Sequence, residues 1–323
     1  MATSRTTTPR IESAYEPIRE GLKRSADMLR LLAVAEEPLL VKQLDHVLQS
    51  TGKRLRPAIA LLSAGFHPND GRAVESMATA VELLHVATLV HDDTVDKADT
   101  RRGRPTVSSL WGPNAAVLIG DYIFATSANF VCDTGNLRVI KRFAETIMEL
   151  SRGEFEESAK AYSPAQDMDS YLDRIYKKTA SLFATASEAG AILSGAPEDV
   201  VVVLRDYGYN VGMAHQIVDD ILDLEGDPEE FGKPVGQDLA HGILTMPSLI
   251  ALERNDGESP VLKYFRNPEE QRALTEAVAA ASDSATPSAR MPLVLAGHIP
   301  NGRDRAVVGQ MLGAQTPVDV VVR

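Results

Sequence analysis

The fold is decided by the stretch RAVESMATAVELLHVATLVHDDTVD, which runs from Arg72 to Asp96. One set of its residues recurs every three or four positions, as residues on a single face of an α-helix do: Met77, Val81, Leu84, Thr88, Asp92 and Asp96. The preceding segment, HPNDG, consists of turn formers, and Asn69 or Asp70 is placed to cap a helix start. The stretch therefore predicts a long core helix that ends in carboxylates.

Helical spacing continues through most of the chain, while the alternating pattern typical of strands is scarce. Further helices are predicted over residues 11–35, 37–48, 53–66, 115–132, 139–161, 170–193, 198–224 and 243–254. We expect one all-α domain over residues 1–323, a bundle of roughly ten or more helices, because no linker divides the chain. Residues 1–10 are predicted to be a mobile lead-in, and residues 278–323, where Ser, Pro, Gly and Arg break the helical spacing, form an atypical C-terminal region.

The composition is that of an ordinary globular protein, with 44% hydrophobic and 24% charged residues. No uninterrupted apolar run approaches the roughly 20 residues that cross a bilayer, so no transmembrane segment is predicted. The formal net charge of −12 argues against nucleic acid as a partner, since nucleic-acid binding favours a basic surface. The one cysteine, Cys132, excludes an internal disulfide and indicates a reducing, cytoplasmic location.

Two copies of one acidic pattern lie 127 residues apart (219 − 92), each at the end of an apolar helical run. Both read D-D-x-x-D: Asp92-Asp93-Thr94-Val95-Asp96 and Asp219-Asp220-Ile221-Leu222-Asp223. The first and last aspartates of each copy share a helix face, where carboxylates repel each other unless a cation or solvent intervenes. One copy alone is more often a solvated helix end, but two copies favour a metal site. Carboxylates suit a hard cation such as Mg²⁺, and the predicted ligands are Asp92, Asp96, Asp219, Asp220 and Asp223.

Two basic segments could receive an anionic ligand beside these carboxylates. Gly52-Lys53-Arg54-Leu55-Arg56-Pro57 places three positive charges at the start of a helix, and Arg101-Arg102-Gly103-Arg104 follows the first acidic copy by five residues. Either segment alone is more often a solvated loop. Because arginine binds phosphate oxygens with two hydrogen bonds, the two segments together predict a phosphate-bearing ligand.

Other polar residues share a helix face with the aspartates. His85 lies two turns before Asp92, and Gln216 lies one turn before Asp219. A lone histidine in an apolar helix is more often a core residue, so a functional role for His85 depends on this alignment. Lys177-Lys178-Thr179 lies within an apolar helix, where an inward lysine needs an anion and the other lysine is expected to face solvent.

The segment from His91 to Thr106 resembles the first aspartate-rich motif of the trans-isoprenyl diphosphate synthases, the polyprenyl synthetase family, and is closest in appearance to medium- and long-chain members. Residues 216–223 resemble the second such motif. Three more segments fit the family in order along the chain: residues 52–57, 178–183 and 231–238. The likeness runs from Lys53 to Leu252 and implies the isoprenoid synthase fold, an all-α bundle around a central cavity.

The resemblance also implies an activity, in which an allylic diphosphate ionises, its cation alkylates isopentenyl diphosphate, and proton loss gives a longer all-trans polyprenyl diphosphate. Mg²⁺, as three ions, would assist the leaving diphosphate. Implied catalytic residues are Asp92, Asp93, Asp96, Arg101, Lys178, Asp219 and Lys233. Implied contacts to isopentenyl diphosphate are Lys53, Arg56, His85 and Arg102, and implied contacts to the allylic substrate are Arg101, Lys178, Thr179, Gln216 and Lys233.

The chain departs from the family pattern in two places. Where the family has a lysine, this chain reads Gly242-Ile243-Leu244-Thr245-Met246-Pro247, and the usual closing segment is missing from the C-terminal region. A class I terpene cyclase would share the bundle, but its second metal motif differs from residues 216–223. A non-catalytic subunit of a heteromeric prenyl synthase would have lost aspartates or phosphate-binding cations, and this chain keeps both sets apart from position 243.

Product length depends on the residues that precede Asp92 on its helix. Small side chains at Ala87 and Thr88, where short-chain synthases carry aromatic plugs, favour a product of geranylgeranyl length or longer. Leu84, deeper on the same face, and Phe143, on another helix, are the further predicted chain-length residues. Family members pair through helices, so a homodimer that uses residues 115–150 is also predicted.

Overall fold

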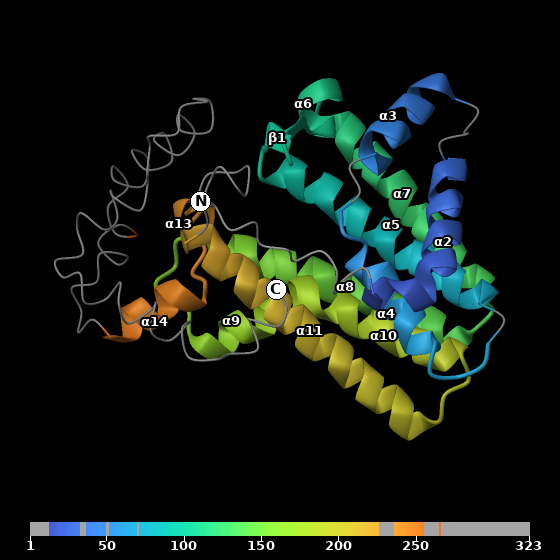
Figure 1. Cartoon of the computed structure of the whole chain (residues 1–323). Helices are drawn as coiled ribbons and strands as arrows, with labels where there is room; N and C mark the ends of the chain where they lie inside the picture. The colour runs from blue at the N-terminus through green and yellow to red at the C-terminus, as the bar shows by residue number, and fades with distance from the viewer. Residues whose placement is uncertain are drawn as a thin grey trace, which may run out of the picture. The chain divides into compact units, whose positions relative to one another are not determined.

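The structure is a computed structural model of the chain, and it describes residues 13–32, 37–49, 52–69, 71–225, 236–254 and 265. Within these ranges the protein is built from helices and one two-stranded hairpin (Figure 1), which confirms the predicted all-α class. The predicted mobile lead-in at residues 1–10, the atypical region 278–323 and the predicted site residue Lys233 lie outside the described residues.

The elements within the described residues follow this order along the chain. They are η1 (Glu16–Ile18), α2 (Arg19–Leu32), α3 (Pro38–Leu48), α4 (Leu55–Ala64), α5 (Arg72–Val95), β1 (Thr100–Arg101), β2 (Arg104–Pro105), α6 (Val107–Trp111), α7 (Pro113–Asp133), α8 (Leu137–Lys160), α9 (Met168–Ile175), the π-helix η2 (Tyr176–Ala180), α10 (Ser181–Leu193), α11 (Glu198–Glu225), α13 (Gln237–Ala240) and α14 (Met246–Arg254).

The chain divides into two compact units. The first unit comprises residues up to Glu149 together with Ala180–Gly212, and the second comprises Leu150–Thr179 and the residues from Met213 onward. Helices α8 and α11 are therefore each divided between the two units. Because each unit is described by itself, the predicted single domain and its central cavity stay predictions.

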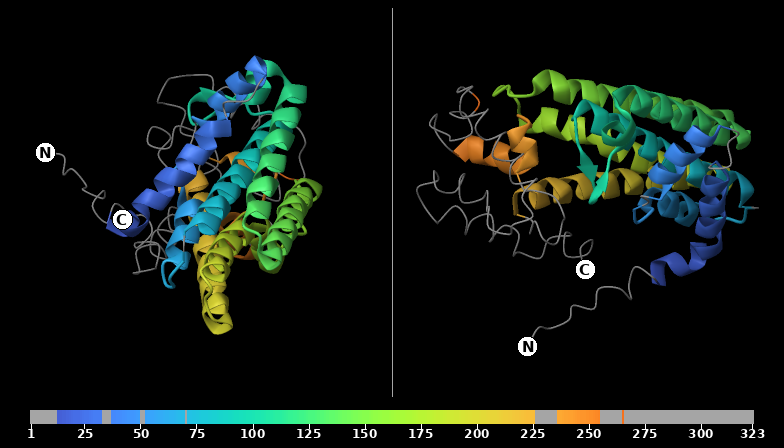
Figure 2. Two further views of the ribbon diagram at one scale, coloured as in Figure 1. Left: turned by 90° about the vertical axis from the view of Figure 1, so that its right-hand side faces the viewer. Right: turned by 90° about the horizontal axis from the view of Figure 1, so that it is seen from above.

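The first unit is organised around α5, which packs along α7, while α4 packs on α10 (Figures 1 and 2). A core cluster joins α5 to α7 through buried aliphatic side chains such as Leu83, Val90 and Ile119. A Cβ atom on Gly190 would lie 2.2 Å from the carbonyl oxygen of Ala60, so α10 approaches α4 this closely only because residue 190 is glycine. Close helix packing of this kind holds the end of α5 in a defined position.

The structure departs from the predicted elements at three places. The helix predicted over residues 170–193 is interrupted by η2, a π-helix, which is a rare element that often marks a functional site. The β1–β2 hairpin and α6 were not predicted, because elements of two to five residues are too short to show a period. Asn69 accepts a hydrogen bond from the Gly71 backbone N–H at 2.9 Å, so it forms the turn before α5, whose N-cap is Gly71 itself.

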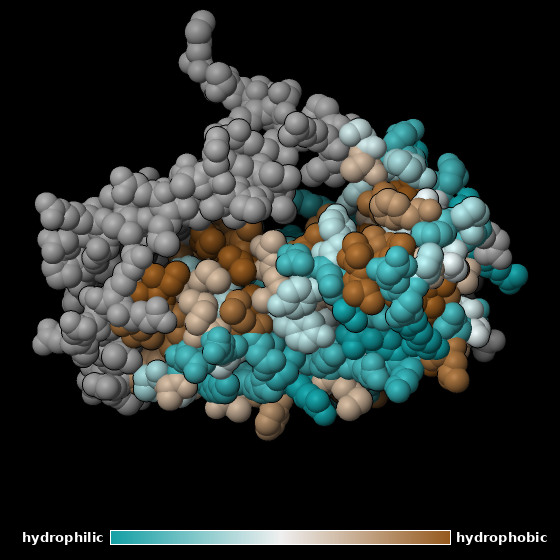
Figure 3. Space-filling view, turned by 90° about the horizontal axis from the view of Figure 1, so that it is seen from below, coloured by the Kyte–Doolittle hydropathy of each residue, from teal (hydrophilic) through white to brown (hydrophobic). Residues whose placement is uncertain are grey.

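Two helices are long and apolar enough to cross a membrane when only length and composition are considered. The apolar stretch of α5 is 78% buried within the protein, as expected of a core helix, and that of α7 is 33% buried. Isolated polar residues interrupt both apolar runs, so neither helix shows the continuous apolar stretch typical of a membrane span. Apolar side chains also reach the surface elsewhere, and patches of them lie among polar residues on the face in Figure 3. The absence of a transmembrane segment therefore stays a prediction.

Candidate functional site

The first acidic motif lies at the C-terminal end of α5, and its aspartates have different environments. Asp93 is 7% exposed and accepts a 2.7 Å hydrogen bond from Nε of Arg101. Burial raises the pKa of the Asp93 carboxyl, and the Arg101 guanidinium opposes that rise. Asp92 is half-buried, and Asp96 is exposed at the C-cap of α5. Asp92 and Asp96 are therefore more exposed than Asp93.

The β1–β2 hairpin brings Arg101 back onto the helix end. Its strands pair Thr100 with Pro105 and Arg101 with Arg104. The turn residues Arg102 and Gly103 both have positive φ, at 52° and 72°, as a two-residue hairpin turn requires. The predicted diphosphate contact Arg101 is thus held by Asp93 in this structure, and its neighbour Arg102 points to a different partner.

Arg102 joins the two basic segments of the first unit. A Cβ atom on Gly52 would lie 2.8 Å from Nη1 of Arg102, so the guanidinium occupies the space that the glycine leaves free. In the same segment, the Arg56 guanidinium lies 4.4 Å from the centre of the Phe183 ring, and the Lys53 carbonyl oxygen accepts a 3.2 Å hydrogen bond from Tyr15. The structure therefore places Arg102 against the segment that carries Lys53 and Arg56.

A buried carboxyl lies behind these cations and was not identified from the sequence. Glu82 on α5 is 4% exposed, and burial raises its pKa while the charges of Arg56, Arg54 and Arg102 oppose the rise. The signal was present, since an acidic residue inside an apolar helical run needs a cation nearby. His85 follows one turn later and is half-buried, and its role stays a prediction.

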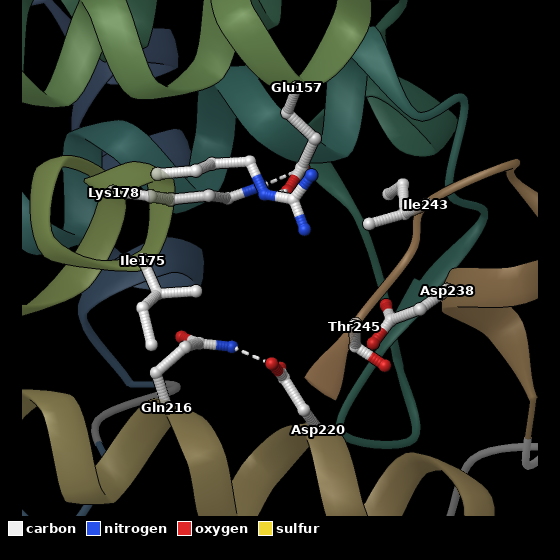
Figure 4. A pocket seen from close by; sticks show the side chains of 9 residues that line it. Glu157, Ile175, Lys178, Gln216, Asp220, Asp238, Ile243 and Thr245 are labelled. Carbon is white, nitrogen blue, oxygen red and sulfur yellow. Dashed lines mark hydrogen bonds and ion pairs between the residues drawn. The ribbon is translucent and has the colours of Figure 1, made fainter. Parts of the chain in front are cut away.

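The second unit contains a pocket of about 370 Å³, part of it open to solvent. Side chains from α8, α9, η2, α11 and α13, and from the segment that leads into α14, point into it (Figure 4). The lining residues are Glu157, Arg174, Ile175, Lys178, Gln216, Asp220, Asp238, Ile243 and Thr245. The predicted allylic contacts Lys178 and Gln216 both lie here. So does Ile243, at the position where the family lysine is missing.

Asp220 is the centre of a buried hydrogen-bond network on one side of this pocket. Its Oδ2 accepts a 2.7 Å hydrogen bond from the Tyr171 hydroxyl, and its Oδ1 accepts one of 2.7 Å from Nε2 of Gln216. The Thr179 hydroxyl donates in turn to Oε1 of Gln216 at 2.6 Å. Burial raises the pKa of Asp220 to about 6, although both donors lower it.

The remaining aspartates of the second motif differ in exposure. The Asp219 side chain is 54% exposed and lies 3.4 Å from Nδ1 of His215. Asp223 is 3% exposed, and its Oδ2 accepts a 3.2 Å hydrogen bond from the Asp238 backbone N–H. Asp220 and Asp223, two of the predicted metal ligands, are thus engaged by protein donors in the structure. Asp219 is the outward carboxylate of this motif.

Both lysines of η2 are paired with carboxylates, so the prediction that one of them faces solvent is wrong. Lys178 contacts Glu157, and its Nζ lies 3.0 Å from Oε2 of Glu154. Lys177 lies 2.7 Å from Glu156 and has a side chain that is 20% exposed. The pairing is possible because α8 carries several glutamates opposite η2.

The carboxylates of each motif are suitable ligands for a metal ion, but they do not form a complete coordination site by themselves. Among the described residues, no three His, Cys, Asp or Glu side chains gather as a metal-binding group. Asp92 and Asp96 are one helical turn apart on the first unit, and Asp219 belongs to the second. A few outward carboxylates together with substrate phosphates form the kind of donor set that Mg²⁺ uses.

The predicted chain-length residues are buried. Ala87 is 1% exposed and belongs to the core cluster between α5 and α7, whereas Leu84, also 1% exposed, lies outside that cluster. Thr88 is half-buried and donates its hydroxyl to the His85 carbonyl oxygen at 2.8 Å. Phe143 on α8 is 2% exposed. Their role as tunnel walls stays a prediction.

Comparison with known proteins assigns the chain to a family. The profile described as polyprenyl synthetase matches residues 37–281. A prenyl transferase of Synechocystis sp. is 41% identical over 245 residues, which cover 75% of this chain and 76% of that protein. The heptaprenyl diphosphate synthase component 2 of Geobacillus stearothermophilus is 42% identical over 243 residues, with coverage of 75% and 76%.

A solved structure agrees with these sequence relatives. The decaprenyl diphosphate synthase of Rhodobacter capsulatus superposes with a TM-score of 0.72 and 35% identity, and the match covers 84% of this chain and 87% of that one. The length of the profile match and the identity to the relatives both exceed what a shared fold alone requires. The chain therefore belongs to the polyprenyl synthetase family.

Proposed function

We propose that this prenyltransferase condenses an allylic diphosphate with isopentenyl diphosphate to give an all-trans polyprenyl diphosphate of geranylgeranyl length or longer. One observation carries the proposal. The neighbouring residues Arg101 and Arg102 connect the acidic end of α5 to the basic segment at Gly52, because Arg101 binds Asp93 while Arg102 packs on Gly52. Carboxylates for a metal and cations for a diphosphate thus meet on one helix end.

The chemistry follows from this charge arrangement. Departure of the allylic diphosphate develops negative charge, against which bound Mg²⁺ would supply positive charge. Asp92 and Asp96 would hold the metal at the first motif, and Asp219 would hold it at the second. Asp93 and Asp220 act as positioning residues, since their oxygens are already engaged by Arg101 and Tyr171.

The protein's own cations divide between the two substrates in this proposal. Lys53, Arg56 and Arg102 of the first unit hold the diphosphate of isopentenyl diphosphate. Lys178 and Gln216 line the pocket of the second unit and hold the allylic substrate. The released diphosphate accepts the proton that is lost after alkylation, so no side-chain base is required. Apolar helix faces exclude water from the cation.

Product analysis tests the reaction. Purified protein with farnesyl diphosphate, isopentenyl diphosphate and Mg²⁺ is expected to give longer polyprenyl diphosphates, detected by mass spectrometry. Arg56→Ala is expected to raise the Michaelis constant for isopentenyl diphosphate more than that for the allylic substrate, and Lys178→Ala is expected to do the reverse. Equal effects on both substrates would contradict the division of roles. Consumption of the allylic diphosphate without any isopentenyl diphosphate would indicate a terpene cyclase, a function that the names of the relatives do not favour.

The assembly state is also a proposal. We infer a homodimer, because α7 exposes large apolar side chains, among them Leu118 at 70% and Val117 at 46%. Two of the relatives are named component 2 of a heptaprenyl diphosphate synthase, which favours a second candidate, a catalytic subunit that needs a different partner chain. Light scattering at micromolar concentration, combined with turnover by the purified chain alone, separates the two.

We also propose a cytoplasmic location on the basis of the exposed, unpaired thiol of Cys132.

A further inference from the structure

Glu157 on α8 connects the two cationic side chains of the second-unit pocket. Its Oε1 contacts Nζ of Lys178 (Figure 4). Its Oε2 lies 3.6 Å from Nε of Arg174. Glu157 has a side chain that is 14% exposed, and Arg174 is 4% exposed, so solvent screens this pairing little. Glu154 adds a second carboxylate, 3.0 Å from Lys178. The Lys178 side chain is 31% exposed, and its ammonium group is contacted by two carboxylates.

The backbone holds this arrangement in place. A Cβ atom on Gly153 would lie 2.8 Å from the backbone N of Lys178, so α8 reaches the π-helical turn this closely only because residue 153 is glycine. Arg174 is fixed independently, since it donates to Oε1 of Gln166 at 2.9 Å and to the Leu244 carbonyl oxygen at 2.6 Å. Glu157 thus faces cations whose positions are set by other contacts.

The pocket has no surplus of positive charge with which to bind an anion. Its lining contains two cationic side chains, Arg174 and Lys178, against three acidic ones, Glu157, Asp220 and Asp238. Ile243 contributes an apolar side chain at the same lining. A diphosphate that binds Lys178 therefore competes for the ammonium group with carboxylates that already contact it.

We propose that Glu157 is a positioning residue that holds the Lys178 ammonium group in the ligand-free pocket and competes for it with the diphosphate of the allylic substrate. The inference rests on the proposed function, in which Lys178 binds that diphosphate. Glu157 keeps the lysine extended into the pocket and ready to bind. It also weakens the bound state, because its negative charge repels the diphosphate and attracts the same ammonium group, and this favours release of the diphosphate after reaction.

The test is Glu157→Gln in the full-length protein. Glutamine keeps the size and an acceptor oxygen but removes the competing charge. Inorganic pyrophosphate with Mg²⁺, titrated calorimetrically, is expected to bind about tenfold more tightly, equivalent to about 1.4 kcal/mol. The Michaelis constant for the allylic substrate is expected to fall, while that for isopentenyl diphosphate stays unchanged. A residue with only a structural role would weaken binding, so unchanged or weaker pyrophosphate binding overturns the proposal.

Glu156→Gln is the matched control. Glu156 is the preceding residue on α8, but it pairs with Lys177 at 2.7 Å and does not line the pocket. Its variant is expected to bind pyrophosphate as the unmodified protein does, and an equal gain in both variants would contradict a specific role for Glu157. If Glu157→Gln fails to fold, Glu154→Gln takes its place. It acts on the same lysine, so a smaller gain of the same sign supports the proposal and no gain overturns it.

The double variant separates this inference from the proposed function. In a Lys178→Ala background, Glu157→Gln is expected to give no gain in pyrophosphate affinity, because Glu157 acts through the lysine. A full gain in that background overturns the inference and leaves the proposed function intact. If Lys178→Ala alone leaves allylic substrate and pyrophosphate binding unchanged, the assignment of Lys178 under the proposed function is wrong.

Discussion

The Tyr171 hydroxyl donates a 2.7 Å hydrogen bond to Oδ2 of Asp220, and both side chains are buried. The first acidic motif repeats this arrangement with a different donor, since Nε of Arg101 binds the buried Asp93 at 2.7 Å. In both motifs the second aspartate is engaged within the protein, while the first is less buried. The repetition indicates that the second aspartate helps to hold each motif in position, and the ligand role of the first aspartate stays a prediction.

Replacing Tyr171 by phenylalanine tests the buried hydrogen bond. The ring stays, but Asp220 loses a donor in a buried site, so the free energy of unfolding is expected to fall by about 1–3 kcal/mol. Urea denaturation measures the change. Tyr207→Phe is the control, because that side chain is 56% exposed, and its stability is expected to remain unchanged. Equal stability of the two variants would contradict a role for the Tyr171 hydroxyl.

The raised pKa of Asp220 predicts a pH-dependent stability in metal-free buffer. An unfolded aspartate titrates near about pH 3.9, whereas burial raises the pKa of Asp220 to about 6. Between these values the folded protein retains a proton that the unfolded chain has released. The stability from protonated Asp220 is therefore fully present below the unfolded pKa and is lost as pH rises through the folded pKa.

Urea denaturation in EDTA from pH 4 to pH 7 measures this effect. Between pH 4 and pH 7, the free energy of unfolding of the unmodified protein is expected to fall by an amount on the order of 3 kcal/mol relative to that of Asp220→Asn, which cannot ionise at this position. Both proteins share every other titrating group, so the difference between their curves isolates Asp220. Parallel curves for the two proteins would show that Asp220 is not held protonated by burial.

Separate substitutions distinguish ligand aspartates from positioning aspartates. Asp92→Asn and Asp219→Asn are expected to reduce turnover by at least about 10²-fold while the melting temperature stays unchanged, since each removes charge from an outward carboxylate. Asp93→Asn is expected to lower the free energy of unfolding by about 1–3 kcal/mol, because Arg101 loses a charged, buried acceptor. Circular dichroism melts and product formation measure the two effects. Normal turnover in a folded Asp92→Asn variant would contradict the prediction that Asp92 binds the metal.

Periodicity predicted the helices well and their interruptions poorly. The stretch from Arg72 to Asp96 forms α5, Arg72–Val95. Its apolar residues recur at helical spacing and are buried on several sides of the helix, so few structures other than a core helix can bury them all. The predicted helix over residues 170–193 carries an equally regular stripe, and nothing in its sequence marks the π-helix at Tyr176–Ala180. Gly153 lies close to that turn, and this contact between separate helices cannot be read from the local sequence.

The candidate site residues could be named from the sequence, but which of them are buried and hydrogen-bonded within the protein could not. Spacing identified the aspartates and the arginine pair. Whether an aspartate is buried depends on a donor elsewhere, and Tyr171 lies 49 residues from Asp220. For the same reason the glutamates opposite Lys178 were missed, since α8 supplies them 21 residues earlier in the chain.

Restoring a lysine at position 243 tests the charge balance of the pocket. Ile243 is half-buried among the lining side chains, with Asp220 and Asp238 in the same lining. Ile243→Lys is expected to lower the Michaelis constant for the allylic diphosphate several-fold, in line with about 1 kcal/mol for an added charge-assisted contact. Ile243→Met, which has similar length without charge, is the control. An equal effect of Met and Lys would show that side-chain shape, and not charge, determines the change.

Substitution of small side chains on α5 by phenylalanine tests whether the growing prenyl chain of the product runs along this helix. Thr88 is half-buried one turn before Asp92, and Thr88→Phe is expected to shift products to shorter prenyl diphosphates while the first condensation continues. Ala87→Phe is expected to shorten products too, but to cost about 1–3 kcal/mol of stability, because Ala87 lies in the packed cluster against α7. Mass spectrometry of products and thermal melts measure both.

The control for overpacking is Ala191→Phe on α10, a residue that is fully buried in a separate cluster with Val201 and Leu204. That variant is expected to lose comparable stability and to keep the product distribution of the unmodified protein. Phe143→Ala, which opens space on α8, is expected to lengthen products if that ring closes the tunnel. Shorter products from Ala191→Phe would mean that product length depends on the stability of the protein and not on the position of the added ring. Unchanged lengths from both α5 variants, in enzymes that still turn over, would mean that the chain grows along another helix.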